Sequence, residues 1–550
     1  MHLVTIRYPS GRPLDFPSGI KVSEAIAGFG PLERPLAAVL VNNELQSLDA
    51  HVLTNCAMEP ITIDSAQGAF SYRRSLCFLA AIAARDLFPE RDLVVGQAIG
   101  YGFYHRFQDG PIAEADIAAL ERRMRELVAE DIPVAMQWWS YEEALAYFRD
   151  HGQEDTLLLL ELTNEPKIAL NECAGFRDLH VTPLVPSTGV LRTFELRPYD
   201  EGFLLRYPRK EKPDEIPAFE DDPLLYKITD DSRRRSGVLG VDSVGALNRL
   251  AAPKRIKDYI TVAESLMTKT VAEIADQVAA RRDTVKVVLI AGPSSSGKTT
   301  TSKKLSIQLR VLGFEPMVIG LDDYFVDRTR TPRDENGEFD FECLEALDVE
   351  YLNEQLLQLF AGEEVELPAF DFKTGERKPS GKRLRLGERT ILIMEGIHGL
   401  NDRLTPRIPR DQKFKIYVSA LTQINLDEHN RISTTDNRLI RRMVRDNQFR
   451  GRSARDTIRM WPSVQRGERL HIFPFQNGAD AALNSALDYE LGVLKVYAEP
   501  LLRSVKPMDP EYCEAKRLLN FLAFFAPIPA QYVPQDSLVR EFIGESSFKY

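Results

Sequence analysis

The sequence has few cysteines and no long apolar segment. Its five cysteines are scattered through 550 residues and form no Cys-x-x-Cys pair. This pattern disfavours a disulfide framework or a zinc site and predicts reduced thiols in a cytoplasmic protein. Apolar stretches such as residues 76–84 fall well short of the ~20 residues that a membrane helix needs. The first residues, MHLVTIRYPSG, show no signal-peptide pattern, so we expect no membrane partner.

The chain also lacks an excess of positive charge. It has 70 Lys and Arg against 81 Asp and Glu, a net charge of −11. That balance argues against non-specific binding to nucleic acid or membranes by the chain as a whole. It has no internal repeat and no low-complexity segment. Its hydrophobic content of 44% and charged content of 27% are ordinary for globular proteins, and its length predicts three or four domains.

The N-terminal residues alternate in polarity as short strands do. Val4 and Ile6 belong to one predicted strand, with turns at Pro9–Gly11 and Asn42-Asn43 and a short helix near Ser23. We therefore expect a small β-rich module with one helix at residues 1–65.

Composition and periodicity divide the rest of the chain. Two helical patterns, at residues 72–87 and 113–131, lie in a mixed α/β region. A stretch rich in proline and charge at 207–223 indicates a domain boundary. The predicted units after the first are 66–215, a linker with connecting helices at 216–283, a nucleotide-binding domain at 284–500 and a helical tail at 501–550.

Residues 287–300 carry the most informative motif. Val287–Ile290 is typical of a buried strand, residues 292–299 fit G-x-x-x-x-G-K-[ST], and a helical pattern follows. Strand, glycine loop and helix predict a P-loop that binds ATP or GTP. Lys298 would reach the β/γ-phosphates, and the Thr299 hydroxyl would ligate Mg²⁺. The predicted nucleotide contacts here are Gly292, Ser294, Ser295, Ser296, Gly297, Lys298, Thr299 and Thr300.

Two later apolar strands end in acids. The segment MVIGLDDYF ends with Asp322 close to the strand terminus, where ligands sit in open α/β sheets. Asp322 is therefore the candidate base that accepts the proton of an acceptor hydroxyl; the alternative is a capping role. The segment TILIMEGIHG places Glu395 similarly, and we interpret Glu395 as a Walker-B-type acid that holds Mg²⁺.

Residues 431–470 are unusually rich in arginine. They contain eleven Arg, no Lys and four acids, a local charge of 11 − 4 = +7. Arg441 and Arg445 share a helical face, and Arg450-Gly451-Arg452 suggests a hinged turn. The planar guanidinium grips phosphate oxygens bidentately, so the segment is predicted to be a lid that excludes water. A solvated basic face or an RNA-binding patch are the alternatives.

The motifs GPSSSGKTT, LDDYF with FDFECLEALD, PAFDF, IMEGI and RRMVRDNQFRGR follow one another in this part of the chain. In this order and spacing, residues 284–500 resemble the uridine kinase/phosphoribulokinase family of P-loop kinases. The resemblance implies an α/β fold with a parallel sheet, Mg²⁺ and ATP as cofactors, a small hydroxylated acceptor and an oligomer.

The resemblance also implies roles for individual residues. Asp322 takes the catalytic base position and Asp340 the sugar-hydroxyl position, although a two-residue insertion makes Glu342 the alternative to Asp340. The other implied roles are catalysis for Lys298 and Arg445, phosphate contact for Arg450, substrate contact for Arg442 and Arg452, and the base pocket for Phe325 and Phe370.

Three positions depart from uridine kinases. Phe370 replaces a tyrosine, Gly375 a histidine and Met460 a glutamine. Because hydrogen bonds to a base edge discriminate strongly, their loss removes that discrimination. The family resemblance therefore implies phosphorylation of a nucleoside-like acceptor without establishing uridine, and a sugar phosphate is the alternative acceptor.

The N-terminal half resembles a different family, the threonyl-tRNA synthetases. Residues 1–65 are similar to their TGS (β-grasp) domain. Residues 66–205 are similar to their α+β editing domain through IGYGFYHRF, ERRMRELVAEDIPV and VPSTG. The metal-type positions of that domain are occupied here by Arg74, Phe78, His180 and Leu184. With three of four ligands lost, we expect neither zinc binding nor deacylation. We expect a binding or regulatory module, whose partner could be tRNA or a regulatory nucleotide.

Overall fold

The structure is a computed structural model that describes residues 2–9, 12–333, 337, 339–371 and 374–549. Part of the predicted turn at Pro9–Gly11 and the last residue of the PAFDF segment lie outside the described residues. Within the described part of the chain, no helix combines the length and apolar character that a bilayer span requires.

The N-terminal module is a five-stranded sheet in the order β2-β1-β7-β4-β5. Val4 and Ile6 of β1 are fully buried between exposed neighbours, as the alternating pattern predicts. Asn42 and Asn43 have φ values of 50° and 62° and join β4 to β5 as an antiparallel hairpin, so the predicted turn is confirmed. The elements are β1 (Leu3–Arg7), β2 (Leu14–Pro17), β3 (Ile20–Lys21), α1 (Val22–Ala25), β4 (Leu36–Val41), β5 (Glu44–Gln46), β6 (His51–Val52) and β7 (Cys56–Thr62).

The second module contains two antiparallel sheets, in the orders β13-β14-β9-β8 and β10-β11-β12. Its long helix α2 begins at Ala66, six residues before the predicted start, because the Ser65 side chain caps it by accepting from the Gly68 amide. The elements are α2 (Ala66–Leu87), β8 (Leu93–Ile99), β9 (Gly102–Phe107), α3 (Glu114–Glu130), β10 (Ala135–Ser140), α4 (Tyr141–Asp150), α5 (Glu154–Leu160), β11 (Lys167–Cys173), β12 (Phe176–Leu179), β13 (Glu195–Tyr199) and β14 (Gly202–Arg206).

Three helices connect this module to the next one: α6 (Pro223–Leu239), α7 (Val244–Arg249) and α8 (Pro253–Ala279). Proline occupies the first turn of α6 and α8, where its missing N–H costs nothing. Helix α8 packs along α9 of the following domain.

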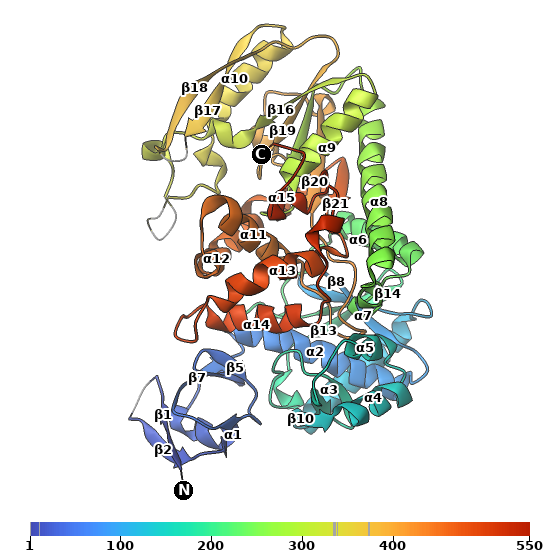
Figure 1. The fold of residues 1–550 in the computed structure, drawn as a ribbon, viewed down its shortest axis with the longest axis vertical. Helices are drawn as coiled ribbons and strands as arrows, with labels where there is room; N and C mark the ends of the chain where they lie inside the picture. The colour runs from blue at the N-terminus through green and yellow to red at the C-terminus, as the bar shows by residue number, and fades with distance from the viewer. Residues whose placement is uncertain (1, 10–11, 334–336, 338, 372–373, 550) are drawn as a thin grey trace.

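A five-stranded parallel sheet in the order β16-β19-β15-β20-β21 forms the centre of the following domain, which confirms the predicted fold class. The central strand β15 is completely buried, as parallel sheets covered on both faces require. A two-stranded hairpin, β17-β18, projects at one end of the molecule (Figure 1). The elements are β15 (Val287–Ala291), α9 (Lys298–Val311), β16 (Glu315–Gly320), the 3₁₀ turn η3 (Leu321–Tyr324), α10 (Val349–Phe360), β17 (Val365–Asp371), β18 (Glu376–Leu384), β19 (Thr390–Glu395), β20 (Lys413–Ser419), α11 (Thr434–Arg450), α12 (Ala454–His471), β21 (Ala481–Asn484) and α13 (Glu490–Arg503).

The C-terminal segment departs from the predicted helical tail. Helix α14 (Tyr512–Ala523) is regular, but the later residues contain only a 3₁₀ turn and the single-turn α15 (Arg540–Ile543) among those described. The chain then returns toward the parallel sheet, and α15 packs beside α11 (Figure 1).

The segment between β20 and α11, residues 420–433, joins the domain of the parallel sheet to the second module through hydrogen bonds. We call it the bridging loop. Its Glu428 carbonyl accepts from the Val95 amide (3.0 Å), and its Asn425 side-chain amide donates to the Val95 carbonyl (2.7 Å). Arg431 donates to Gln97 of the second module (2.8 Å). The loop is therefore bonded to the edge strand β8 of the second module before the chain enters α11.

A buried ionic cluster strengthens this contact. His429 Nδ1 lies 3.5 Å from Asp178 Oδ2 of β12, and Asp427 accepts from Asn430 Nδ2 at 2.7 Å. Burial alone would lower the pKa of His429, but the carboxylates of Asp178, Glu428 and Asp427 outweigh it and raise that pKa to about 9. The imidazolium is therefore the form that the cluster stabilises.

Replacing this histidine is expected to loosen the contact in a pH-dependent way. His429→Asn leaves buried carboxylates without their cation, a loss of about 3–5 kcal/mol for a buried ion pair. Because the folded-state pKa lies above the ordinary value of 6.5, the stabilisation is complete below pH 6.5 and disappears as the pH rises through about 9. Thermal melts of the full chain from pH 6 to 10 should show a Tm gap from wild type that closes at high pH. The exposed His51 provides the control, His51→Asn, with little effect at any pH, and a gap that persists at pH 10 would contradict the assignment.

Candidate active site

The phosphate loop follows β15 and ends at the first turn of α9. Ser295 and Gly297 have φ values of 58° and 82°, and a Cβ on Gly292 would lie 1.9 Å from the Val418 carbonyl oxygen. Glycine is therefore required at Gly292 by the close approach to β20 and favoured at Gly297 by its left-handed backbone. The first amides of α9 have no intrahelical partner, so the loop and the helix N-terminus together present donors suited to anions.

Lys298, Thr299 and Glu395 meet beside this loop. The Thr299 hydroxyl donates to Glu395 Oε1 (2.7 Å), and Lys298 Nζ donates to the carbonyls of Gly292 (2.9 Å) and Pro293 (3.2 Å). Burial lowers the pKa of Lys298, whereas the nearby charges of Glu395 and Glu541 raise it. For Glu395 burial has the opposite effect and raises the pKa, while the charge of Lys298 and the Thr299 hydrogen bond lower it.

Asp322 approaches the same place from the neighbouring strand. It belongs to η3, directly after β16, which pairs in parallel with β19 so that Gly320 stands opposite Glu395. Burial raises the pKa of Asp322, and the positive charge of Lys298 opposes this. The structure thus brings together four side chains that the sequence singled out on three separate segments: Lys298, Thr299, Asp322 and Glu395.

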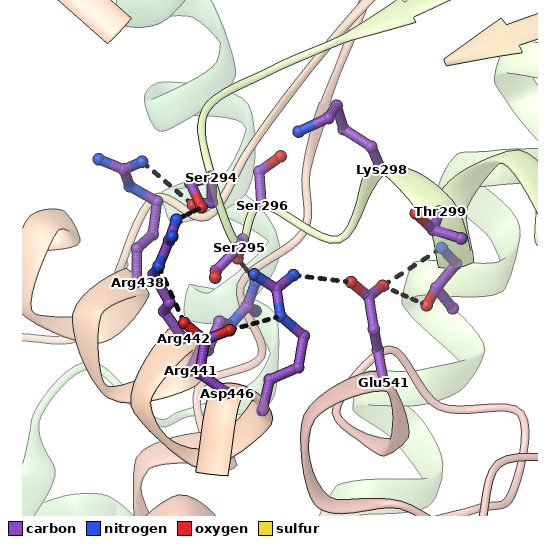
Figure 2. A network of polar contacts seen from close by, with 12 residues as sticks. Ser294, Ser295, Ser296, Lys298, Thr299, Arg438, Arg441, Arg442, Asp446 and Glu541 are labelled. Atoms are coloured by element: carbon purple, nitrogen blue, oxygen red, sulfur yellow. Dashed lines mark hydrogen bonds and ion pairs between the residues drawn. The ribbon is translucent and has the colours of Figure 1, made fainter. Parts of the chain in front are cut away.

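The arginines of α11 line the opposite side of the phosphate loop (Figure 2). Arg442 donates to the Ser294 hydroxyl at 2.7 Å, and Arg441 donates to the Ser295 carbonyl at 3.1 Å. Arg445 Nη1 lies 3.6 Å from Glu541. The predicted lid helix therefore contacts the loop through its side chains.

Most of the positive charge in residues 431–470 has partners within the chain. Asp446 is fully buried and lies 3.3 Å from Arg442, 3.8 Å from Arg445 and 3.2 Å from Arg450. Acids outside the segment pair with several of the others; the pairs are Arg441–Glu490, Arg445–Glu541, Arg455–Asp509 and Arg459–Glu511. The local excess of +7 is thus largely offset by folding and does not by itself require an external polyanion.

Arg450 and Arg452 flank Gly451, which has a φ of 63° and ends α11. Arg450 is half exposed and is one of the charges that act on Asp322. Arg452 donates to the Met460 sulfur at 3.3 Å. The predicted hinged turn therefore lies at the rim of the site, and the positive charge of Arg450 acts on Asp322.

On the acceptor side, the rings of Phe325 and Phe370 pack at a centroid distance of 5.5 Å. Glu342 is half-buried, its pKa is raised by desolvation, and the charges that act on it include Arg442, Lys298 and Asp322. Asp340 accepts from the Glu342 amide at 3.0 Å and so caps the local turn. Of the two carboxylates that the sequence left open, Glu342 is the one on which the charges of Lys298 and Asp322 act.

Three acids at the site were missed from the sequence. Glu468 of α12 accepts from the Ser294 amide at 2.8 Å and pairs with Arg438. Asp446 organises the lid arginines, and Glu541 reaches α9 from the C-terminus. Asp446 stands at i+4 from Arg442 and i−4 from Arg450, a spacing that could have identified it; no local signal marks the other two.

Comparison with known proteins assigns the domain of the parallel sheet to a family. Residues 287–489 match the Phosphoribulokinase / Uridine kinase family. The match covers β15, α9, Asp322, Glu395 and α11, so the resemblance inferred from the motifs is confirmed for this kinase-family region.

Curated relatives match another part of the chain, its N-terminal region. The threonine–tRNA ligase of Symbiobacterium thermophilum is 31% identical over 197 residues, 35% of this chain and 30% of that protein. The threonine–tRNA ligase of Paraburkholderia phymatum is 34% identical over 197 residues, 35% of this chain and 31% of that protein. The chain spans about a third of the length of these relatives, and the second predicted resemblance is also confirmed.

Solved structures similar to this chain include kinases. One is a possible uridine kinase from Bacillus stearothermophilus, with 27% identity over 26% of this chain and 79% of that one and a TM-score of 0.22. Another is D-glycerate 3-kinase from Cryptococcus neoformans, with 14% identity over 46% of this chain and 87% of that one and a TM-score of 0.22. Both TM-scores are low, so the fold assignment rests on the parallel strand order and the phosphate loop.

The positions that correspond to editing-domain ligands are used for packing and for contact with the kinase-family region. Phe78 and Leu184 are buried in the apolar core of the second module. Arg74 donates to Asn430 of the bridging loop, and His180 Nδ1 lies 2.7 Å from Asn171 Oδ1. Burial, together with the charge of Arg74, lowers the pKa of His180 to about 4. The bridging loop thus contacts this part of the second module.

Proposed function

We propose that the protein is a kinase that transfers the γ-phosphoryl group of Mg·ATP to a hydroxyl of a small nucleoside-like acceptor. The observation that carries this proposal is the meeting of Lys298, Asp322, Thr299 and Glu395 at the carboxyl ends of β15, β16 and β19. A phosphate-binding cation, a carboxylate that can accept a proton and a pair of oxygen ligands are what phosphoryl transfer requires of a protein.

Each of these residues has a distinct task in the proposed reaction. The acceptor oxygen attacks the γ-phosphorus while the bond between the γ-phosphorus and the β–γ bridging oxygen breaks. Asp322 takes the proton of the acceptor hydroxyl. Its pKa, raised by desolvation, makes it a stronger base than an aspartate with the ordinary pKa. Lys298 and Arg445 stabilise the charge that develops on the transferred group and on ADP. Arg450, at the rim, would close over the phosphates and exclude water.

The residues present fit a magnesium ion. Thr299 and Glu395 place a hydroxyl and a carboxylate oxygen 2.7 Å apart at the end of the phosphate loop, and Mg²⁺ prefers oxygen ligands of this kind. When bound, the ion would neutralise phosphate charge. Thr299 and Glu395 are the side chains that would hold it.

The acceptor pocket favours a nucleoside-like or sugar-phosphate acceptor over strict recognition of uridine. A Cβ at Gly375 would lie 2.7 Å from Arg328 Nε, and its φ is 76°. No side chain therefore extends from this position toward a base, and Phe370 brings no hydroxyl. The second candidate, a phosphoribulokinase-type activity on a sugar phosphate, is supported by this loss of base-reading groups.

A screen of acceptors tests the proposal. Purified full-length chain is incubated with Mg·ATP and single nucleosides or sugar phosphates, and ADP release is measured together with product mass. We expect one class to give acceptor-dependent ADP with a phosphorylated product. Acceptor-independent ADP release across both classes, with no phosphorylated product, would contradict a kinase function.

Glu342 is expected to contribute more to acceptor binding than Asp340. A hydrogen bond from a sugar hydroxyl to a carboxylate contributes about 1.5–3 kcal/mol, so Glu342→Gln should raise the acceptor KM about 10- to 100-fold with a small change in the KM for ATP. Asp340→Asn, which changes only the carboxylate that caps the turn, is the matched comparison. Steady-state kinetics of both variants decide the question, and the reverse ranking would return the sugar contact to Asp340.

The synthetase-like half is proposed to have a regulatory or sensing role, with tRNA or a nucleotide as the ligand to test. Contact of Arg74 with Asn430 of the bridging loop would let such a ligand act on the kinase-family region. Binding of tRNA to the full chain, measured across a salt series, tests this role. No salt-dependent binding at low ionic strength would remove tRNA as the ligand.

A further inference from the structure

The C-terminal segment, residues 531–547, packs onto the phosphate loop and the lid helix. Leu538 is completely buried, and a Cβ on Gly297 would lie 2.1 Å from its Cδ2 atom. Gln448 near the end of α11 donates to the Ile543 carbonyl at 3.0 Å, and Lys304 of α9 lies 3.1 Å from Asp536. The segment is thus attached to both elements that would enclose a nucleotide.

Its Glu541 side chain takes donors that a P-loop offers to phosphate. Glu541 Oε2 accepts from the Thr300 hydroxyl at 2.6 Å and from the Thr300 amide at 3.3 Å. Thr300 is the third residue of α9, in the first turn, where helix polarity favours an anion. Figure 2 shows the carboxylate between the first turn of α9 and the side chains of α11.

Positive charges act on Glu541, as they would on a phosphate. Arg445 Nη1 lies 3.6 Å from Glu541 Oε1, and Glu541 is one of the charges that act on Lys298. The side chain is only 7% exposed. A carboxylate that lies beside an arginine and a helix N-terminus occupies surroundings that suit a phosphate equally well.

Glu468, another acid that contacts the phosphate loop, differs from Glu541 in having an arginine bound to both of its carboxylate oxygens. Glu468 accepts from the Ser294 amide and pairs with the buried Arg438 through both of its oxygens. It therefore keeps a dedicated cation. Among the described residues, the cation within ion-pair distance of Glu541 is Arg445, which the proposed function assigns to the nucleotide.

We propose that the C-terminal segment is an autoinhibitory latch in which Glu541 occupies the position of a nucleotide phosphate. The latch rests on the proposed binding of ATP at this loop. A phosphate that takes the Thr300 donors must displace Glu541, because both are anions competing for one set of N–H and O–H groups. Binding of a phosphate-bearing ligand and release of residues 531–547 are then the same event.

The test compares ligands with and without phosphates. Affinities of the full chain for ATP, inorganic tripolyphosphate and adenosine are measured by calorimetry for wild type and Glu541→Gln, which keeps the shape and removes the charge. If the latch is open in about a tenth of the molecules, its release tightens binding about tenfold. We expect that gain for ATP and tripolyphosphate and an unchanged affinity for adenosine.

Two more variants test whether the gain in affinity comes from the Glu541 carboxylate. Glu545→Gln alters a neighbouring carboxylate that is 83% exposed and pairs with Arg540, so its affinities should stay within twofold of wild type. Asp536→Asn breaks the ion pair with Lys304 outside the phosphate loop and should tighten ATP in the same direction as Glu541→Gln, by less. Thermal melts confirm that each variant folds.

The outcomes separate the latch from the proposed function. Wild type that binds neither ATP nor tripolyphosphate, while Glu541→Gln also binds neither, would overturn both. Wild type that binds ATP while Glu541→Gln binds it equally or more weakly would overturn the latch alone. A tenfold gain that extends to adenosine would also overturn it, because adenosine carries no group that competes with a carboxylate.

Discussion

Lys298→Ala is expected to reduce phosphoryl transfer by about 10²–10³-fold. A preorganised cation in a water-excluded site contributes several kcal/mol to the stabilisation of developing charge. Lys298 is half-buried and its Nζ donates to the Gly292 and Pro293 carbonyls at the loop, so a short movement of its Nζ would bring it to a phosphate. The measurement is kcat and kcat/KM for the acceptor identified by the screen.

The control for this variant is Lys286→Ala. Lys286 precedes β15 and lies at the opposite end of that strand, where its ammonium stacks on Phe360. Its removal should leave transfer within about twofold of wild type. Turnover of Lys298→Ala close to that of the control would remove the phosphate loop from the mechanism.

Asp322→Asn is expected to slow transfer by about 10²–10⁴-fold, the usual contribution of a general base, with nucleotide affinity nearly unchanged. The amide preserves size and one acceptor oxygen but cannot take the hydroxyl proton. Asp323→Asn is the matched comparison, because the neighbouring Asp323 carboxylate accepts from the Phe370 amide at 3.4 Å. Loss of nucleotide binding in Asp322→Asn would reassign this acid to the metal.

The pH profile gives a second measure of the same assignment. Burial raises the pKa of Asp322 above 3.8, and a base must be deprotonated to work. Activity of the wild type should therefore fall as the pH drops through that raised pKa, and Asp322→Asn should lose this acid limb. An acid limb that survives in the variant would assign it to another group.

The local elements of the kinase-family region were predictable because their signals are short in range. A β-branched run, two glycines and a helical pattern specify β15, the phosphate loop and α9 over 25 residues, from Val287 to Val311. Parallel pairing then places the ends of β16 and β19 side by side, which is why Asp322 and Glu395 could be assigned to one site from separate strands.

The remaining parts of the site depend on contacts between distant segments. Glu541 meets Thr300 across 241 residues, and a single glutamate after an apolar run has no periodicity that would reveal it. The excess of arginine in residues 431–470 indicated an external partner when read along the chain. Folding supplies Glu490, Asp509 and Glu511 from outside that stretch, and linear charge counts do not contain this information.

The bridging loop has a mechanical consequence. The chain leaves β20, is bonded to β8 through Glu428 and Asn425, and enters the arginine-bearing α11 at Thr434. The N-terminal end of α11 is therefore held by the synthetase-like half, and Arg450 lies at the other end of the helix. A displacement of the second module would therefore be transmitted to Arg450 along the seventeen residues of α11.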